Sequence, residues 1–217
     1  MSGYREALTA VDIVLDPDAA MRALAAEHNG RMLRSVPAPH GFALDANHRP
    51  HISLLQRYVR TAAIDQVCEA IAQVHRSVDL AALTLEARAL THVVLQPAIG
   101  IGAVLVAPGA EVIDLQARLI DALEPFAGLG GTADAFVRTA DEPDIDDATI
   151  EFIETYVPQH SGANYVAHVT VGLARLDDLA VLEAQPFRPL AFSAEALSIY
   201  QLGNNGTAAR LLKTWIR

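Results

Sequence analysis

The sequence contains a single cysteine, Cys68, which excludes an internal disulfide and a zinc site built from several cysteines. Its apolar neighbours Val67 and Ile71 favour a buried thiol in a reducing compartment. No apolar run approaches the length of about 18 residues that a membrane span needs. Residues 1–21 are interrupted by charges and lack the apolar stretch of a secretory signal. We therefore expect no membrane contact and a cytoplasmic location.

Basic side chains are also scarce. The 16 Lys and Arg residues face 26 Asp and Glu residues, which gives a net charge of −10 and a pI near 5.1. Such a field repels polyanions, so tight non-specific binding to long DNA or RNA is not expected. A small phosphorylated ligand is still compatible with this charge, because a local pocket can differ in sign from the whole protein.

Apolar residues, in contrast, make up 52% of the 217 residues, and only 19% are charged. This composition excludes disorder and provides for a sizeable core. A chain of this length forms either one large domain or two small, closely packed lobes.

Strand-like and helix-like periodicities alternate along the chain. The predicted strands cover residues 10–15, 51–59, 83–89, 92–96, 101–106, 165–173, 192–202 and 208–216. The predicted helices cover residues 19–33, 62–74, 112–123 and 146–156. Asp16-Pro17-Asp18 caps the first helix, and Asn204-Asn205-Gly206 is a hairpin signal between the last two strands. The glycine-rich residues 128–144 are the best candidate for a mobile loop.

Two segments share one pattern, in which a histidine is followed by an apolar residue, a hydroxyl residue and another apolar residue. The first is His51-Ile52-Ser53-Leu54, and the second is His168-Val169-Thr170-Val171. One lies in each half of the chain, and both fall in predicted strands. From the composition alone, about 0.2 such motifs are expected by chance. The duplication therefore points to a shared site.

Strand geometry places the histidine and the hydroxyl of each motif on one face, because residues i and i+2 project to the same side. Imidazole moves protons near neutral pH, and a hydroxyl can donate to a non-bridging phosphate oxygen. Two facing pairs would therefore supply a base and an acid on opposite sides of one phosphate. Either histidine alone is more often a packed core or strand-edge residue, whereas the pair with hydroxyls in register favours catalysis.

The duplicated motif resembles that of the two-histidine (2H) phosphoesterase superfamily, which includes bacterial 2′-5′ RNA ligases and cyclic nucleotide phosphodiesterases. The order of elements is also similar over essentially the whole chain. The resemblance implies one α+β domain over residues 1–217, built from two pseudo-symmetric, intertwined lobes around a central cleft. Each lobe is expected to be a mainly antiparallel sheet with helices on its outer side.

The same resemblance implies a phosphoesterase acting on nucleotide 2′,3′-cyclic phosphates or 2′-5′ linkages, reversible as RNA ligation. His51 and His168 would be the catalytic acid and base, in an order that the sequence leaves open. Ser53 and Thr170 would hold the non-bridging oxygens. We expect no cofactor, no metal and a monomeric state. The expected partner is a small nucleotide or a short RNA end that carries a cyclic phosphate.

Some other residues have a possible functional role. Arg57 shares strand parity with Ser53, so an uninterrupted strand would aim its guanidinium at the same phosphate; a solvated strand end is an equally good interpretation. His40, His48 and His51 could belong to a metal-dependent hydrolase, although the turn-like sequence between them does not fix their spacing.

Two further alternatives stay open. Tyr200 and Trp215 could stack a base, while core packing is the more common role for such residues. The chain could also be a nucleotide- or RNA-binding module that keeps the site without physiological turnover.

Overall fold

The computed structural model describes residues 6–38, 40–140 and 142–217. Residues 1–5 of the expected domain, and residue 141 of the expected mobile loop, lie outside this range. Two four-stranded antiparallel sheets form the framework: sheet A has the order β2-β1-β7-β8, and sheet B has the order β5-β4-β3-β6. The strands are β1 (Leu8–Pro17), β2 (Ile52–Arg60), β3 (Leu85–Gln96), β4 (Ile99–Pro108), β5 (His168–Arg175), β6 (Leu190–Phe192), β7 (Ala194–Leu202) and β8 (Ala208–Ile216). The helices are α1 (Ala19–Ser35), α2 (Ile64–His75), α3 (Ala110–Leu123), α4 (Asp147–His160) and α5 (Leu176–Glu183).

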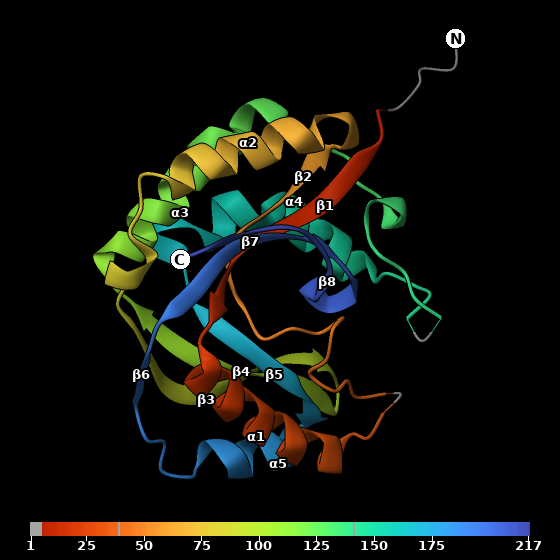
Figure 1. Cartoon of the computed structure of the whole chain (residues 1–217). Helices are drawn as coiled ribbons and strands as arrows, with labels where there is room; N and C mark the ends of the chain where they lie inside the picture. Colours follow the sequence, from red (N-terminus) through yellow and green to blue (C-terminus); the bar gives the residue numbers. More distant parts are fainter. Residues whose placement is uncertain (1–5, 39, 141) are drawn as a thin grey trace.

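The layers follow from which face of each sheet is apolar. On sheet A, Val11, Ile13 and Leu15 lie on one face with Leu197 and Ile199, all fully buried. Helices α2 and α3 cover sheet A on one side of the molecule, and α1 and α5 cover sheet B on the opposite side (Figure 1). The predicted α+β class with two similar lobes and outer helices is confirmed.

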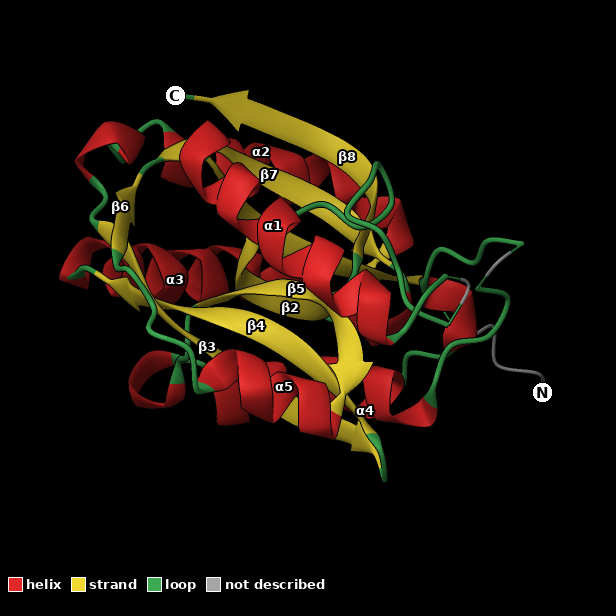
Figure 2. Ribbon diagram, turned by 90° about the horizontal axis from the view of Figure 1, so that it is seen from below, coloured by secondary structure: helices red, strands yellow, loops and turns green. Residues whose placement is uncertain are grey.

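Two helices cross from one lobe to the other. Helix α1 follows β1 of sheet A but packs on β5 of sheet B, and α3 follows β4 of sheet B but packs on β2 of sheet A. Figure 2 shows α1 passing in front of both sheets, with β2 and β5 side by side behind it. The two lobes are thereby intertwined, and each receives a helix from the other half of the chain.

The predicted helix start at residues 16–18 has a clear physical cause. The Asp18 side chain accepts hydrogen bonds from the amides of Ala20 and Met21, which caps α1. Pro17 ends β1 instead of opening the helix. The hairpin signal at Asn204-Asn205-Gly206 does join the last two strands, and Asn205 adopts a positive φ of 55° there.

Two expectations about secondary structure were wrong, and one helix was missed. The two strands predicted over 83–96 form one continuous strand, β3, because the chain pairs with β4 through the intervening residues. The strand predicted over 192–202 is split into β6 and β7, which belong to different sheets. Helix α5 was not predicted, since it is short and buries only Leu179. Among the described residues, no helix has the length and apolarity to cross a membrane.

Candidate active site

Each histidine motif contains a β-bulge at the same position. In the ladder between β1 and β2, Val14 pairs with Ser53 and Ile13 pairs with Leu55, so Leu54 is the extra residue. In the ladder between β4 and β5, Ala103 pairs with Thr170 and Gly102 pairs with Gly172, so Val171 is the extra residue. The two lobes thus share a local irregularity directly after the hydroxyl residue.

In the second motif, Gly172 makes the bulge possible. Its φ of 136° lies in a region that other residues rarely adopt. A Cβ atom at this position would also lie only 2.9 Å from the Asn29 side-chain amide. A glycine after the motif is therefore required by both backbone conformation and space.

The bulge corrects the expected position of Arg57. Because one residue is inserted after Ser53, Gln56 lies on the face of Ser53, and its amide donates to the Ser53 hydroxyl (3.2 Å). Arg57 projects to the opposite face, where its guanidinium donates to Glu124 (2.7 Å) and to the Ile120 carbonyl oxygen (3.3 Å). The structure therefore does not bring Arg57 together with the two histidines.

The two imidazoles are held in the same way. The Nδ1 of His51 donates to the carbonyl oxygen of Arg49 (2.6 Å), and the Nδ1 of His168 donates to the carbonyl oxygen of Val166 (2.9 Å). In each case the acceptor lies two residues before the histidine. A backbone acceptor at Nδ1 fixes the tautomer and leaves Nε2 for proton exchange. Both rings are thus prepared for acid or base work at Nε2.

The electrostatic surroundings of the two rings differ. Burial alone would lower the pKa of His51, but the carboxylate of Asp12 outweighs it and the pKa is raised. The His51 Nε2 lies 3.5 Å from Asp12 Oδ2. His168 keeps an exposed edge, yet the protein around its ring removes enough water to lower its pKa. The charge of His51 lowers the His168 pKa further, while the Val166 carbonyl and the Asp12 carboxylate partly offset this effect by raising it.

The two hydroxyls also differ in their partners. Ser53 Oγ donates to Asp12 Oδ2 (2.6 Å), so its proton is already engaged. Among the residues that the structure describes, none hydrogen-bonds the hydroxyl of Thr170, which is half-buried. Thr170 is therefore the hydroxyl that is free to donate to a ligand.

Two buried amide side chains hold the bulges, and we call them the amide clamps. Gln116 of α3 donates to the carbonyl oxygen of Leu54 (2.9 Å) and accepts from the amide of Gly162 (2.9 Å), in the loop before the second motif. Asn29 of α1 donates to the carbonyl oxygen of Val171 (3.0 Å) and accepts from the amide of Leu44 (3.2 Å), in the loop before the first motif. Each clamp thus joins the bulge of one motif to the loop that precedes the other motif.

A third connection passes through the backbone of the first motif. The phenols of Tyr156 on α4 (3.3 Å) and Tyr165 (2.9 Å) both donate to the carbonyl oxygen of Ser53. Burial raises the pKa of both phenols, so both remain protonated donors. Tyr165 lies shortly before His168 in the chain, so this contact fixes the two motifs relative to each other.

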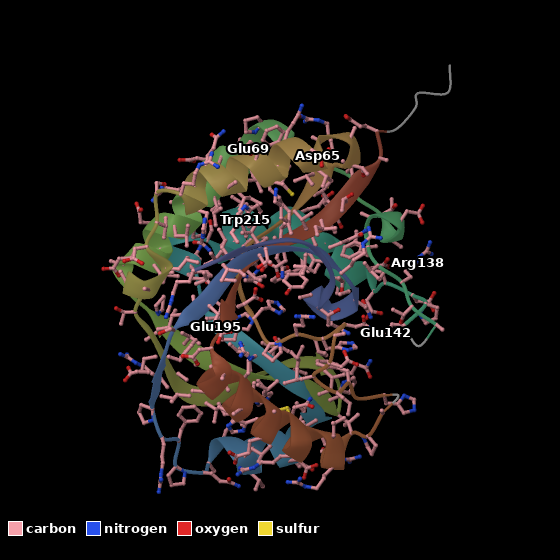
Figure 3. All side chains as sticks on the ribbon, in the orientation of Figure 1. Asp65, Glu69, Arg138, Glu142, Glu195 and Trp215 are labelled. Carbon is pink, nitrogen blue, oxygen red and sulfur yellow. The ribbon has the colours of Figure 1, made fainter. Side chains whose placement is uncertain are left out.

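The histidines of the metal-dependent alternative have different surroundings and different hydrogen-bond partners. His48 bonds Asp45 (3.0 Å) through Nδ1 and Glu142 (3.2 Å) through Nε2, while His40 is exposed. Figure 3 shows Glu142 at the outer edge of the molecule. Within the described ranges, no group of three or more His, Cys, Asp or Glu side chains is arranged to hold a metal ion.

The late-strand aromatics have partners of their own within the protein. Trp215 packs against the core below α2, and the amine of Lys213 lies 5.6 Å from its ring centre (Figure 3). Tyr200 is 1% exposed, and its phenol donates to Asp16 (3.4 Å). Two surface hollows, of about 560 Å³ between α1 and α5 and about 400 Å³ between α2 and α3, are also lined by none of the motif residues. The candidate site is therefore confined to the region where β2 meets β5.

Sequence reasoning missed Asp12, Gln56 and the amide clamps. A signal for Asp12 was present, because it is the only charged residue within the apolar run 10–15. A charge inside a buried strand requires a partner, and that requirement could have been followed to a histidine. Gln56 and the clamps gave no such signal, since their partners are set by bulges and by helices from the other lobe.

No protein-family model matches the sequence, and no curated protein matches it either. Solved structures do match. TT0787 of Thermus thermophilus has a TM-score of 0.55 at 14% identity, over 96% of this chain and 97% of that chain. LigT of E. coli, complexed with 3′-AMP, has a TM-score of 0.48 at 13% identity, over 97% and 98%. Usb1 of Kluyveromyces marxianus has a TM-score of 0.43 at 12% identity, over 98% and 99%.

The match to TT0787 extends over nearly the whole of both chains and carries the comparison of folds. The expected α+β fold of two similar lobes is therefore confirmed, and the chain shares this fold with TT0787. One motif from each lobe lies where β2 meets β5.

Proposed function

We propose that the chain is a phosphoesterase that hydrolyses nucleotide 2′,3′-cyclic phosphates or 2′-5′ phosphodiester linkages by two-histidine acid/base catalysis. The observation that carries the proposal is the matched pair of imidazoles. Each has Nδ1 bound to a backbone carbonyl and Nε2 left for proton transfer, and the strands that follow or contain the two motifs, β2 and β5, are in contact. This arrangement suits a reaction that needs one acid and one base.

In the proposed reaction, one imidazole takes a proton from the attacking water and the other gives a proton to the leaving ribose oxygen. The free hydroxyl of Thr170 holds a non-bridging oxygen of the phosphate, where negative charge grows in the transition state. With a ribose hydroxyl in place of water as the nucleophile, the same site would open the cyclic phosphate and form a phosphodiester, which is ligation. None of these steps calls for a metal ion.

The experiment is a turnover assay on a panel of nucleoside 2′,3′-cyclic phosphates and 2′-5′-linked dinucleotides, before and after dialysis against EDTA. We expect product formation that survives EDTA, with the position of the product phosphate read by ³¹P NMR. Binding without product would favour the alternative of a binding module. Loss of turnover on chelation, with rescue by zinc or manganese, would favour the metal-dependent hydrolase.

We also propose that the partners are small nucleotides or short RNA ends. The net charge of −10 opposes a long polyanion, and Arg57 is already paired with Glu124. A site that contacts one or two phosphates loses little affinity as salt rises. A protein neutralising 6 to 10 phosphates would instead lose about 10³- to 10⁵-fold between 50 and 200 mM salt. Titrations of a cyclic mononucleotide and a long RNA at several salt concentrations separate the two cases.

A further inference from the structure

The two lobes differ at one pair of positions next to the catalytic motifs. In the first lobe, Asp12 of β1 pairs with Gln56, three residues after Ser53. The matching positions in the second lobe are Ile101 of β4 and Leu173, three residues after Thr170. A carboxylate and an amide therefore lie beside one histidine, while two aliphatic side chains take their place beside the other.

Asp12 has an unbalanced charge. It is 0% exposed, and its Oδ2 accepts hydrogen bonds from Ser53 (2.6 Å) and Gln56 (2.8 Å). Its other oxygen, Oδ1, is buried without a hydrogen-bond partner in the described part of the chain. Among the described residues, His51 is the one basic group within 4 Å of this carboxylate. A buried carboxylate is strongly destabilising unless a cation compensates it, so the pair favours protonated His51.

We infer that Asp12 is a positioning residue that keeps His51 protonated, so that His51 is the general acid and His168 the general base. The inference rests on the proposed function and assigns the two roles that the sequence left open. Within the described residues, no carboxylate lies within 4 Å of His168, and Asp12 raises the His168 pKa only as a lesser cause than burial. The His168 Nε2 is the unprotonated nitrogen of the ring, because Nδ1 donates to Val166.

The assignment gives a balanced reaction. The His168 Nε2 takes a proton from water as the water oxygen bonds to phosphorus. The bond from phosphorus to the ribose oxygen breaks with its electron pair on that oxygen, which receives the proton of His51 Nε2. The turnover ends with His168 protonated and His51 neutral, and exchange with solvent restores both. While His51 is neutral, Asp12 favours its reprotonation.

Other charged and titratable groups face the two rings. Asp16, on β1, adds a weaker negative field at His51, and its carboxylate accepts hydrogen bonds from Ser198 (2.5 Å) and Tyr200 (3.4 Å). The phenols of Tyr156 and Tyr165 approach from α4 and from the loop before β5, and Arg49 is exposed. His160 of α4 adds a positive field at His168. Asp12 is the nearest of the acidic groups to His51, so its replacement is the decisive perturbation.

The first test is an NMR titration of ¹³C-labelled histidines in the free protein, with the resonances assigned from His51→Gln and His168→Gln. We expect His51 to titrate at higher pH than His168. In Asp12→Asn, the His51 titration should move to lower pH, while His168 moves much less. The control is Asp177→Asn, which removes one exposed acidic charge from α5 and should change neither titration. An inverted order in the wild-type protein, or an unchanged His51 in Asp12→Asn, would overturn the inference. The wild-type titration decides the order even if the variant does not fold.

The second test uses turnover. A p-nitrophenyl nucleoside phosphodiester has a leaving group that needs no general acid, so it should be hydrolysed by His51→Ala but not by His168→Ala. In Asp12→Asn, the high-pH limb of the kcat/KM profile should move to lower pH, while the low-pH limb moves much less. Hydrolysis of the p-nitrophenyl substrate by His168→Ala but not by His51→Ala would show that His168 is the acid and His51 the base, which would overturn the inference. A protein that turns over no substrate would contradict the proposed function, whereas the NMR titration would still decide which histidine Asp12 controls.

Discussion

Replacing an amide clamp tests whether the bulges depend on it. Gln116→Met keeps the length and apolar volume of the side chain but removes its donor and acceptor. The carbonyl oxygen of Leu54 is then buried without a partner, because Leu54 is 0% exposed. Such a group costs about 1–3 kcal/mol. The amide of Gly162 lies nearer solvent and can bind water, so losing its hydrogen bond to Gln116 should cost about 0.5–1.5 kcal/mol more.

The expected loss of unfolding free energy is therefore about 2–4 kcal/mol, a large part of the 5–15 kcal/mol typical of a domain. The measurement is urea denaturation followed by circular dichroism, with equal slopes in both proteins as the check on two-state behaviour. The matched control is Gln66→Met, the same substitution at an exposed position of α2, which should change stability by less than about 0.5 kcal/mol. Equal stability of the two variants would refute the clamp. Asn29→Leu should cost at least as much, because Asn29 also donates to the carbonyl oxygen of Phe42 (2.9 Å).

The remaining predictions concern turnover and pH. His51→Ala and His168→Ala should each reduce turnover of cyclic nucleotides by about 10²- to 10⁴-fold, and near-normal rates with an unchanged melting temperature would contradict the two-histidine mechanism. Thr170→Val should reduce kcat by about 10²-fold. Ser53→Ala should reduce kcat less, because the Ser53 hydroxyl already donates to Asp12 whereas the Thr170 hydroxyl is free. Steady-state kinetics of both variants would show the reverse order if Ser53 held the phosphate. The pKa of His48 is raised, since its two carboxylate partners outweigh burial. The stabilisation of the folded protein by protonated His48 should therefore be fully present below about pH 6.5, the ordinary pKa of histidine. It should be lost as pH rises through the raised pKa of His48. Urea denaturation should show a larger penalty for His48→Gln in mild acid than in mild alkali, and a penalty independent of pH would exclude this coupling.

The α+β fold class, which the resemblance to the two-histidine family implied, is confirmed, while the catalytic role of the two histidines stays a prediction. Strand periodicity placed each histidine and its hydroxyl on one face, and the family resemblance that the duplicated motif carries implied two lobes. The same periodicity misplaced Arg57, because a bulge reverses the alternation and leaves no mark in residue types: Leu54 and Leu55 are both apolar and both 0% exposed.

The partners of the motifs could not be predicted for a different reason. Asn29 and Gln116 lie on helices that cross between the lobes, and each is hydrogen-bonded to segments far away in the sequence. Helical periodicity identifies which face of a helix is buried, but it contains no information about which sheet the helix meets. Asp12 was recognisable as a charge in an apolar strand, yet its link to His51 depends on strand pairing.

The paired bulges change which positions face the site in each lobe of this chain. After the hydroxyl residue the alternation changes phase, so the next side chain on the site face lies five residues after the histidine: Gln56 in one lobe and Leu173 in the other. A search that assumes strict alternation would examine Leu55 and Gly172, which face away from the site. The residue at this fifth position, together with its partner on the neighbouring strand, distinguishes the polar half of the site from the apolar half. Exchanging these pairs between lobes is therefore a route to engineering which histidine carries the proton.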